Sequence, residues 1–200
     1  MNTVTDIERP TESGRWKALK SGTAATHERL DQRIMAGEPF RDRERYGLFV
    51  TVQYHFHRDI DALYDHPALD AALPDLAGRR RLPLIDQDLA DLGLPLPVPD
   101  RAPPFDVDAD VPIALGWLYV AEGSNLGAAF LLKMAAKLGL SENFGARHLA
   151  GAPEGRGLHW RTFTTALDTV TLDAAQEARV IDGANAAFSR VHALVNRIFS

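Results

Sequence analysis

One histidine, His27, stands in an amphipathic segment at a position where the pattern predicts an apolar side chain. The inward positions recur at steps of three and four residues: Trp16, Leu19, Thr23, His27, Leu30 and Ile34. A histidine there is either a core residue satisfied by a neighbouring carboxylate or carbonyl, or a metal or heme ligand, because neutral imidazole is the commonest metal-binding side chain. Lys20 lies two turns earlier on the same face, about 10 Å away along the axis. Since a heme iron and its propionates are separated by a similar span, one helix can supply both an iron ligand and a cation for the propionates.

A stripe of small residues in a long apolar segment is the second candidate group. It recurs at steps of three and four and consists of Gly116, Tyr119, Gly123 and Gly127. Glycine inside a helix costs about 1 kcal/mol relative to alanine, so its repetition requires a reason. Either the small residues let two helices pack closely, or a flat ligand contacts the backbone directly. Two polar neighbours, Ser124 and Asn125, can hold a water molecule beside such a ligand.

Helices are the elements that must position both groups, because strand signals are weak throughout the chain. Apolar periodicity and helix-breaking residues predict helical segments over residues 16–34, 41–64, 68–73, 79–92, 111–138, 154–170 and 173–199. Six of the twelve prolines fall between Pro95 and Pro112, which predicts an irregular connection. We expect one all-α domain over residues 14–200, preceded by a loose arm at residues 1–13.

Composition excludes several classes of site and partner. The 200-residue chain has no cysteine, so it has no disulfide, zinc-thiolate site, iron–sulfur cluster or cysteine nucleophile. Its net charge of −5 disfavours nucleic acid as a partner. The first thirteen residues lack the apolar run of a signal peptide, and Glu122 interrupts the most apolar region, residues 111–140. We therefore expect no membrane span and a cytoplasmic location.

Other motifs are less informative. His55 and His57 are two residues apart, so on a helix they point in different directions. No Glu-x-x-His or Gly-x-Ser-x-Gly sequence occurs, which argues against a di-iron bundle site and a serine hydrolase. The run Arg79-Arg80-Arg81 is interpreted as a solvated helix start, with a docking patch for an acidic electron donor as the alternative. The remaining histidines are expected to be surface or structural residues: His66, His148, His159 and His192.

Three motifs resemble those of the bacterial, biliverdin-producing heme oxygenases, and the resemblance covers residues 14–199. Thr-Ala-Ala-Thr-His-Glu-Arg-Leu-Asp (residues 23–31) resembles the proximal helix of that family. Gly-Trp-Leu-Tyr-Val-Ala-Glu-Gly-Ser-Asn-Leu-Gly-Ala (residues 116–128) resembles its distal helix, and Glu-Gly-Arg-Gly-Leu-His-Trp (residues 154–160) fits the same branch. The resemblance implies a helical bundle with heme between a proximal and a kinked distal helix. It also implies the heme-site residues: His27 as axial ligand, Gly123 and Gly127 at the bound oxygen, Lys20 and Tyr119 at the propionates, and, as weaker correspondences, Lys133 and Phe188.

The distal motif departs from the family at one position. Many members carry an aspartate beside the distal glycines that organises water, whereas this sequence reads Glu122-Gly123-Ser124-Asn125-Leu126-Gly127. We expect Ser124 or Asn125, together with backbone carbonyls, to hold the water instead.

The resemblance also implies a reaction and its partners. Heme b, as both substrate and cofactor, would react with O2 and electrons to give biliverdin, CO and ferrous iron. With both Lys20 and Tyr119 present, we expect the α isomer. A ferredoxin- or flavodoxin-type reductase system would supply the electrons, and the products would serve iron release or a bilin-accepting photoreceptor. The alternative is a non-catalytic heme carrier or sensor, which the lack of a second histidine on the distal stripe disfavours.

Overall fold

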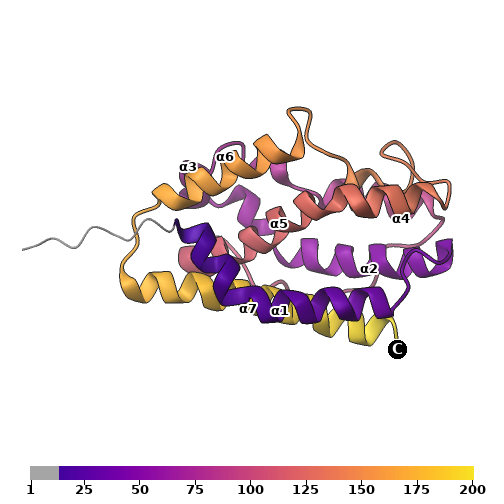
Figure 1. The fold of residues 1–200 in the computed structure, drawn as a ribbon, viewed down its shortest axis with the longest axis horizontal. Coiled ribbons are helices and arrows are strands. Elements are labelled where there is room, and N and C mark those ends of the chain that lie inside the picture. Colours follow the sequence, from indigo (N-terminus) through magenta and orange to yellow (C-terminus); the bar gives the residue numbers. More distant parts are fainter. Residues whose placement is uncertain (1–13) are drawn as a thin grey trace, which may run out of the picture.

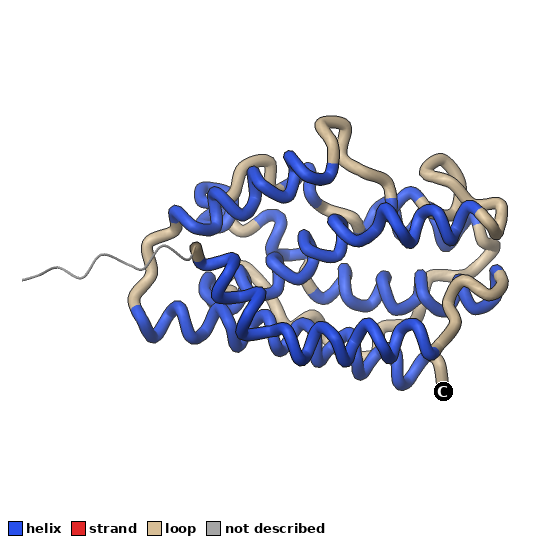
Figure 2. Tube along the Cα trace, in the orientation of Figure 1, coloured by secondary structure: helices blue, strands red, loops and turns tan. Residues whose placement is uncertain are grey.

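The computed structural model describes residues 14–200, which form helices joined by loops (Figures 1 and 2). The α-helices are α1 (Arg15–Ala36), α2 (Arg43–Asp59), α3 (Pro67–Ala72), α4 (Leu82–Asp91), α5 (Val111–Ala136), α6 (Arg156–Thr169) and α7 (Ala174–Ile198). Three short 3-10 helices are η1 (Asp61–Asp65), η2 (Ala77–Arg79) and η3 (Arg147–Leu149). No β-strand forms within these residues, so the all-α prediction is confirmed. The arm expected at residues 1–13 lies outside the described part of the chain.

The two longest C-terminal helices begin where the sequence predicts. Asp110 caps α5 by accepting a hydrogen bond from the backbone nitrogen of Ile113 at 3.0 Å, and Pro112 stands in the first turn. Asp173 caps α7 through a reciprocal capping box with Gln176. In the described residues, no helix has the length and apolar character needed to cross a membrane.

Two predicted segments are divided in the structure. The segment expected over residues 41–64 consists of α2 followed by η1, with the break at Ile60. The segment expected over residues 79–92 consists of the end of η2 and, after Arg81, helix α4. The interpretation of the arginine run as a solvated helix start is wrong for Arg79 and Arg81, which are 2% and 9% exposed. Arg79 is buried because it pairs with a buried carboxylate on α5, that of Glu122, at 2.6 Å.

Helices α5 and α7 cross in direct backbone contact. A Cβ added to Gly116 of α5 would lie 2.2 Å from the carbonyl oxygen of Val180, and one added to Gly183 of α7 would lie 2.3 Å from that of Ile113. Because neither position has room for a methyl group, these two glycines fix the crossing of the two helices. Figure 1 shows α1 beside α7, so these three helices form the framework on which the site is built.

A buried ion-pair network ties the proline-rich connection to this framework. Asp59, fully buried at the end of α2, accepts hydrogen bonds from Arg101 and Arg190, each at 2.7 Å. Arg190 of α7 also donates to both carboxylate oxygens of Asp100 at 2.8 Å. Since Asp100 and Arg101 lie near the middle of the connection between α4 and α5, its irregular backbone is anchored there to α2 and α7.

Candidate functional site

A cavity of about 800 Å³ lies between α1, α2, α5 and α7. This volume is in the upper part of the range of roughly 300–1,000 Å³ that is typical of pockets for cofactors and other small molecules. Eight of the residues predicted from the sequence line it together: Lys20, His27, Tyr119, Gly123, Ser124, Asn125, Gly127 and Phe188. Residues about 100 positions apart in the sequence therefore meet around one space.

His27 presents its imidazole to this cavity from α1. Its side chain is 58% exposed, and its ring centroid lies 5.3 Å from that of Phe188. The Nε2 atom lies 3.5 Å from a carboxylate oxygen of Asp31, one turn later on the same helix. One of the two interpretations of its position was a core histidine satisfied by a neighbouring carboxylate or carbonyl, and the exposure of His27 shows that it is not a core residue. Its ring nitrogen is accessible to a ligand in the cavity.

The glycines of α5 separate into two groups. Gly116 packs against α7, as described above, whereas a Cβ added to Gly127 would meet no atom within 4 Å. A Cβ added to Gly123 would make only ordinary contact with the Trp160 ring, at 3.8 Å. Close helix packing therefore explains the first glycine and not the other two. Gly123 and Gly127 instead leave the backbone of α5 open to the cavity.

The predicted propionate contacts differ in where they lie. Lys20 is exposed and lines the cavity, two turns before His27 on α1. Tyr119 lines it from α5, and burial raises the pKa of its phenol, so the hydroxyl is a neutral donor. Lys133 is exposed on α5 and is not among the residues that line the cavity. It is therefore not placed to contact a molecule bound in the cavity.

Further polar side chains that the sequence did not single out also line the cavity. Gln53 and His57 of α2 and His148 of η3 are among them. Asp88 accepts a hydrogen bond from the His148 backbone and lies 2.7 Å from its Nδ1, while burial lowers the pKa of His57 to about 3. Within residues 14–200, the buried Nδ1 of His57 and Nε2 of His148 have no hydrogen-bond partner. Two polar side chains with an unsatisfied nitrogen therefore belong to the cavity lining.

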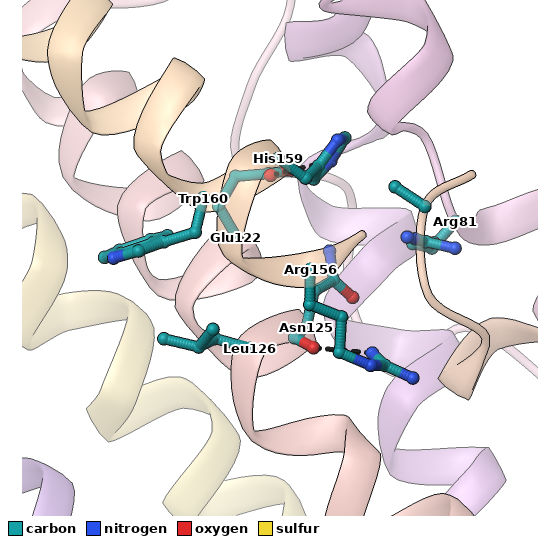
Figure 3. A pocket seen from close by; sticks show the side chains of 8 residues that line it. Arg81, Glu122, Asn125, Leu126, Arg156, His159 and Trp160 are labelled. Atoms are coloured by element: carbon teal, nitrogen blue, oxygen red, sulfur yellow. Dashed lines mark hydrogen bonds and ion pairs between the residues drawn. The ribbon is translucent and has the colours of Figure 1, made fainter. Parts of the chain in front are cut away.

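The two expected water-holding residues differ in their hydrogen bonding. The Ser124 hydroxyl donates to the carbonyl oxygen of Ala121 at 2.7 Å, one turn earlier in α5. The backbone carbonyl of Asn125 accepts a hydrogen bond from Arg156 at 2.7 Å, and its side chain lies between this cavity and a smaller one (Figure 3). Among the described residues the Asn125 amide has no hydrogen-bond partner, whereas the Ser124 hydroxyl is already bonded within α5.

Comparisons with known proteins agree with this geometry. The sequence model of the heme oxygenase family matches residues 107–197. The chain is 44% identical over 178 residues to heme oxygenase PigA of Pseudomonas aeruginosa, which covers 89% of each protein. The chain belongs to the heme oxygenase family. It is also 36% identical over 116 residues to a heme oxygenase of Xanthomonas campestris, covering 57% of this chain and 66% of that protein.

Solved structures of other heme oxygenases have the same fold. The NO- and CO-bound heme oxygenase of Neisseria meningitidis superposes with a TM-score of 0.88 at 41% identity, over 93% of this chain and 92% of that one. Heme oxygenase-1 of Synechocystis, in complex with heme, has a TM-score of 0.71 at 18% identity, which shows the common fold, over 92% of both chains. This protein is thus an enzyme with the all-α fold of the heme oxygenases.

The cavity of this heme oxygenase fits a heme group. It offers an accessible imidazole on α1, an open glycine backbone on α5 and a cation two turns from the imidazole. These are the kinds of group that can ligate an iron, leave room for O2 and pair with a propionate. Within residues 14–200, no group of three or more His, Cys, Asp or Glu side chains could hold a metal ion directly.

Sequence reasoning missed the polar residues of α2 and η3 for a specific reason. His57 was compared with His55, two residues away, whereas its partner on the same helical face is Gln53, one turn earlier. That spacing of four was the available signal. His148 gave no such signal, because its position depends on its contact with Asp88 of α4, sixty residues earlier.

Proposed function

We propose that this heme oxygenase binds heme b in the 800 Å³ cavity, with His27 as axial ligand, and cleaves it to biliverdin, CO and ferrous iron. The observation that carries the proposal is that His27, Gly123 and Gly127 line the same cavity from two different helices. Bound heme supplies the site of O2 activation and is itself the molecule that is cleaved. The protein contributes ligation, placement and protons.

The α5 backbone controls access to one face of the heme. Because Gly123 and Gly127 have no side chain and Gly127 meets no neighbouring group, the helix can approach the bound ligand closely. A larger residue would place a methyl group in the space that O2 must occupy. The two glycines therefore direct the reaction toward one edge of the macrocycle by steric restriction.

Lys20 and Tyr119 fix the in-plane rotation of the heme. A lysine cation and a neutral phenol donor both suit propionate carboxylates. Since rotation decides which meso carbon faces the oxygen, this pair selects the α isomer in our proposal. Lys133 and Phe188 remain weaker candidates, and of these only Phe188 lines the cavity.

Water on the oxygen-binding side is held by polar side chains that line the cavity: Asn125, Gln53, His57 and His148. Both imidazoles carry a buried nitrogen without a partner among the described residues. Buried polar atoms of this kind are normally satisfied by ordered water. They replace the aspartate that many family members use beside the distal glycines.

The remaining partners follow from the reaction. O2 is the co-substrate, and a ferredoxin- or flavodoxin-type reductase system in the cytoplasm supplies electrons. The products serve iron release, or supply a bilin-accepting photoreceptor.

An optical assay tests the proposed function. Heme is added to the protein, followed by ascorbate in air, and the Soret band is recorded. We expect the band to disappear while biliverdin absorption grows, and chromatography to identify mainly the α isomer. A Soret band that persists under reductant in air contradicts the proposed turnover, and a different main isomer contradicts the role of Lys20 and Tyr119.

A further inference from the structure

Behind α5 lies a second, much smaller cavity, shown in Figure 3. Its volume is about 10 Å³, close to the minimum needed for one water molecule. Asn125, Leu126 and Trp160 line both this cavity and the heme cavity, so they form the wall between the two. Its other lining residues are mostly charged or titratable: Arg81, Glu122, Arg156 and His159, with Ala152.

Glu122 is the buried carboxylate of this small cavity. Its side chain is 1% exposed, and Arg79 donates a hydrogen bond to its Oε2 at 2.6 Å. The other oxygen, Oε1, is buried and has no hydrogen-bond partner among residues 14–200. A buried carboxylate oxygen without a partner is costly, which makes a bound water at this position favourable.

His159 connects Glu122 to the surface. Its Nε2 lies 3.3 Å from Oε2 of Glu122, and its Nδ1 lies 2.7 Å from a carboxylate oxygen of Glu154. The Glu154 side chain is 43% exposed, whereas that of His159 is 9% exposed. A histidine oriented by a carboxylate at Nδ1 and free to exchange its proton at Nε2 is the arrangement used in general acid–base catalysis.

We propose that His159 and Glu122, with one water in the small cavity, form a proton-donating path to the oxygen-binding side of the heme cavity. This inference rests on the proposed placement of heme. In the donating step the N–H bond at Nε2 of His159 breaks and its proton binds Oε2 of Glu122. Rotation of the protonated carboxyl group then brings this proton to the water, so Glu122 returns to its carboxylate form, and the water passes one of its own protons to the heme cavity past Asn125. His159 is left neutral, with its Nδ1–H group donating a hydrogen bond to Glu154. It regains a proton from bulk solvent between turnovers.

The charges around His159 support this role. Proximity to Glu122 and to Glu154 raises the pKa of His159 above its ordinary value, against the opposing effects of burial and Arg79. The other charged groups lining the small cavity, Arg81 and Arg156, are cations. A raised pKa increases the fraction of His159 that carries a proton at a given pH, and heme cleavage consumes protons.

The first test uses the heme-free protein, so it does not depend on heme placement. Nuclear magnetic resonance titration of the His159 ring should give a pKa above that of the partly exposed control His192. Glu122→Gln and Glu154→Gln should each lower the pKa of His159, and Glu44→Gln, a change at an exposed residue of α2, should leave it unchanged. A His159 pKa at or below that of His192, or one unaffected by both changes, overturns the proposal.

The second test uses the heme-loaded enzyme. The rate of Soret loss in wild type should fall as the pH rises through the His159 pKa measured by resonance. His159→Gln should slow Soret loss at least about tenfold and remove that pH dependence, with heme affinity unchanged, whereas His192→Gln should behave as wild type. If His159→Gln does not fold, Glu154→Gln must shift the pH profile by the amount it shifts the His159 pKa. A wild-type rate and pH profile in these variants contradicts the path. Failure of heme to bind at His27 contradicts the proposed function and leaves the heme-free titration valid.

Discussion

His27 owes its chemistry to exposure, although its helical position predicts burial. Thr23 and Leu30 lie about one turn before and after His27 on the same face of α1. Both are buried, with 2% and 5% of their surface exposed. The imidazole itself faces the cavity, and Phe188 of α7 lies beside it at a ring-centroid distance of 5.3 Å. An inward position that borders a cavity is thus exposed in the absence of ligand and available for coordination.

Lys20 provides the residue-scale prediction about regiochemistry. Lys20→Ala removes the cation proposed to hold a propionate, so the heme should rotate more freely. A partly exposed ion pair contributes up to about 1 kcal/mol, so the minor biliverdin isomers should increase by about fivefold. Chromatography of the products measures this, with Lys17→Ala as control, because Lys17 is exposed on the same helix and does not line the cavity. An unchanged isomer ratio in Lys20→Ala refutes the role of this lysine.

At the scale of elements, α5 combines two uses of glycine in one helix. Gly116 permits the crossing with α7, and Gly123 and Gly127 expose the backbone to the cavity. The sequence predicted the stripe and left both explanations open, because spacing alone does not show which helix or ligand faces a glycine. Only the packing of α7 and the position of Trp160 separate the two groups.

Alanine substitutions should separate these roles. Gly127→Ala adds a methyl group where no atom lies within 4 Å, so it should raise the free energy of unfolding by up to about 1 kcal/mol. The same methyl group intrudes on the heme cavity and should slow heme turnover by about tenfold.

Gly116→Ala should lower the free energy of unfolding by about 1–3 kcal/mol, because its methyl group meets the α7 backbone. Chemical denaturation and Soret loss measure both effects, and a destabilised Gly127→Ala with normal turnover contradicts the assignment.

Element boundaries were predictable where local capping decides them. The starts of α5 and α7 follow from Asp110 and Asp173, whose side chains cap the helices. The division at Ile60 has no local capping signal, and the burial of Arg79 depends on a long-range pair with Glu122. An arginine run has the same appearance in the sequence whether it is solvated or paired in the interior. The buried charges of the site were therefore the part that sequence reasoning could not find.

At the scale of the whole molecule, the Asp59 network joins segments that are far apart in the sequence. Arg190→Met removes a partner from fully buried Asp59 and from Asp100, leaving their charges less compensated. We expect the free energy of unfolding to fall by about 3 kcal/mol, within the range for breaking a buried pair. Arg161→Met, at an exposed residue of α6, should change it by less than about 0.5 kcal/mol. Equal effects of the two changes in urea denaturation would show that the network does not stabilise the fold.

Stability should also depend on the protonation of His57. Burial lowers the pKa of His57 in the folded protein to about 3, so below pH 6.5 the unfolded chain binds a proton there that the folded chain does not. The free energy of unfolding should therefore fall as the pH falls from 6.5 toward 3, by about 1.4 kcal/mol per pH unit from this residue. Urea denaturation at pH 7 and pH 5 measures this loss, which should be smaller in His57→Asn. The same pH dependence in both proteins contradicts a neutral, buried His57.

The most direct test of the central claim is the absorption spectrum of the heme complex of His27→Ala. We predict loss of the signature of an axial nitrogen ligand and of Soret decay under ascorbate in air, because no other residue is proposed to ligate the iron. Added imidazole should restore both, since it fits the space left by the removed ring. A wild-type spectrum and turnover in His27→Ala without imidazole would contradict the account.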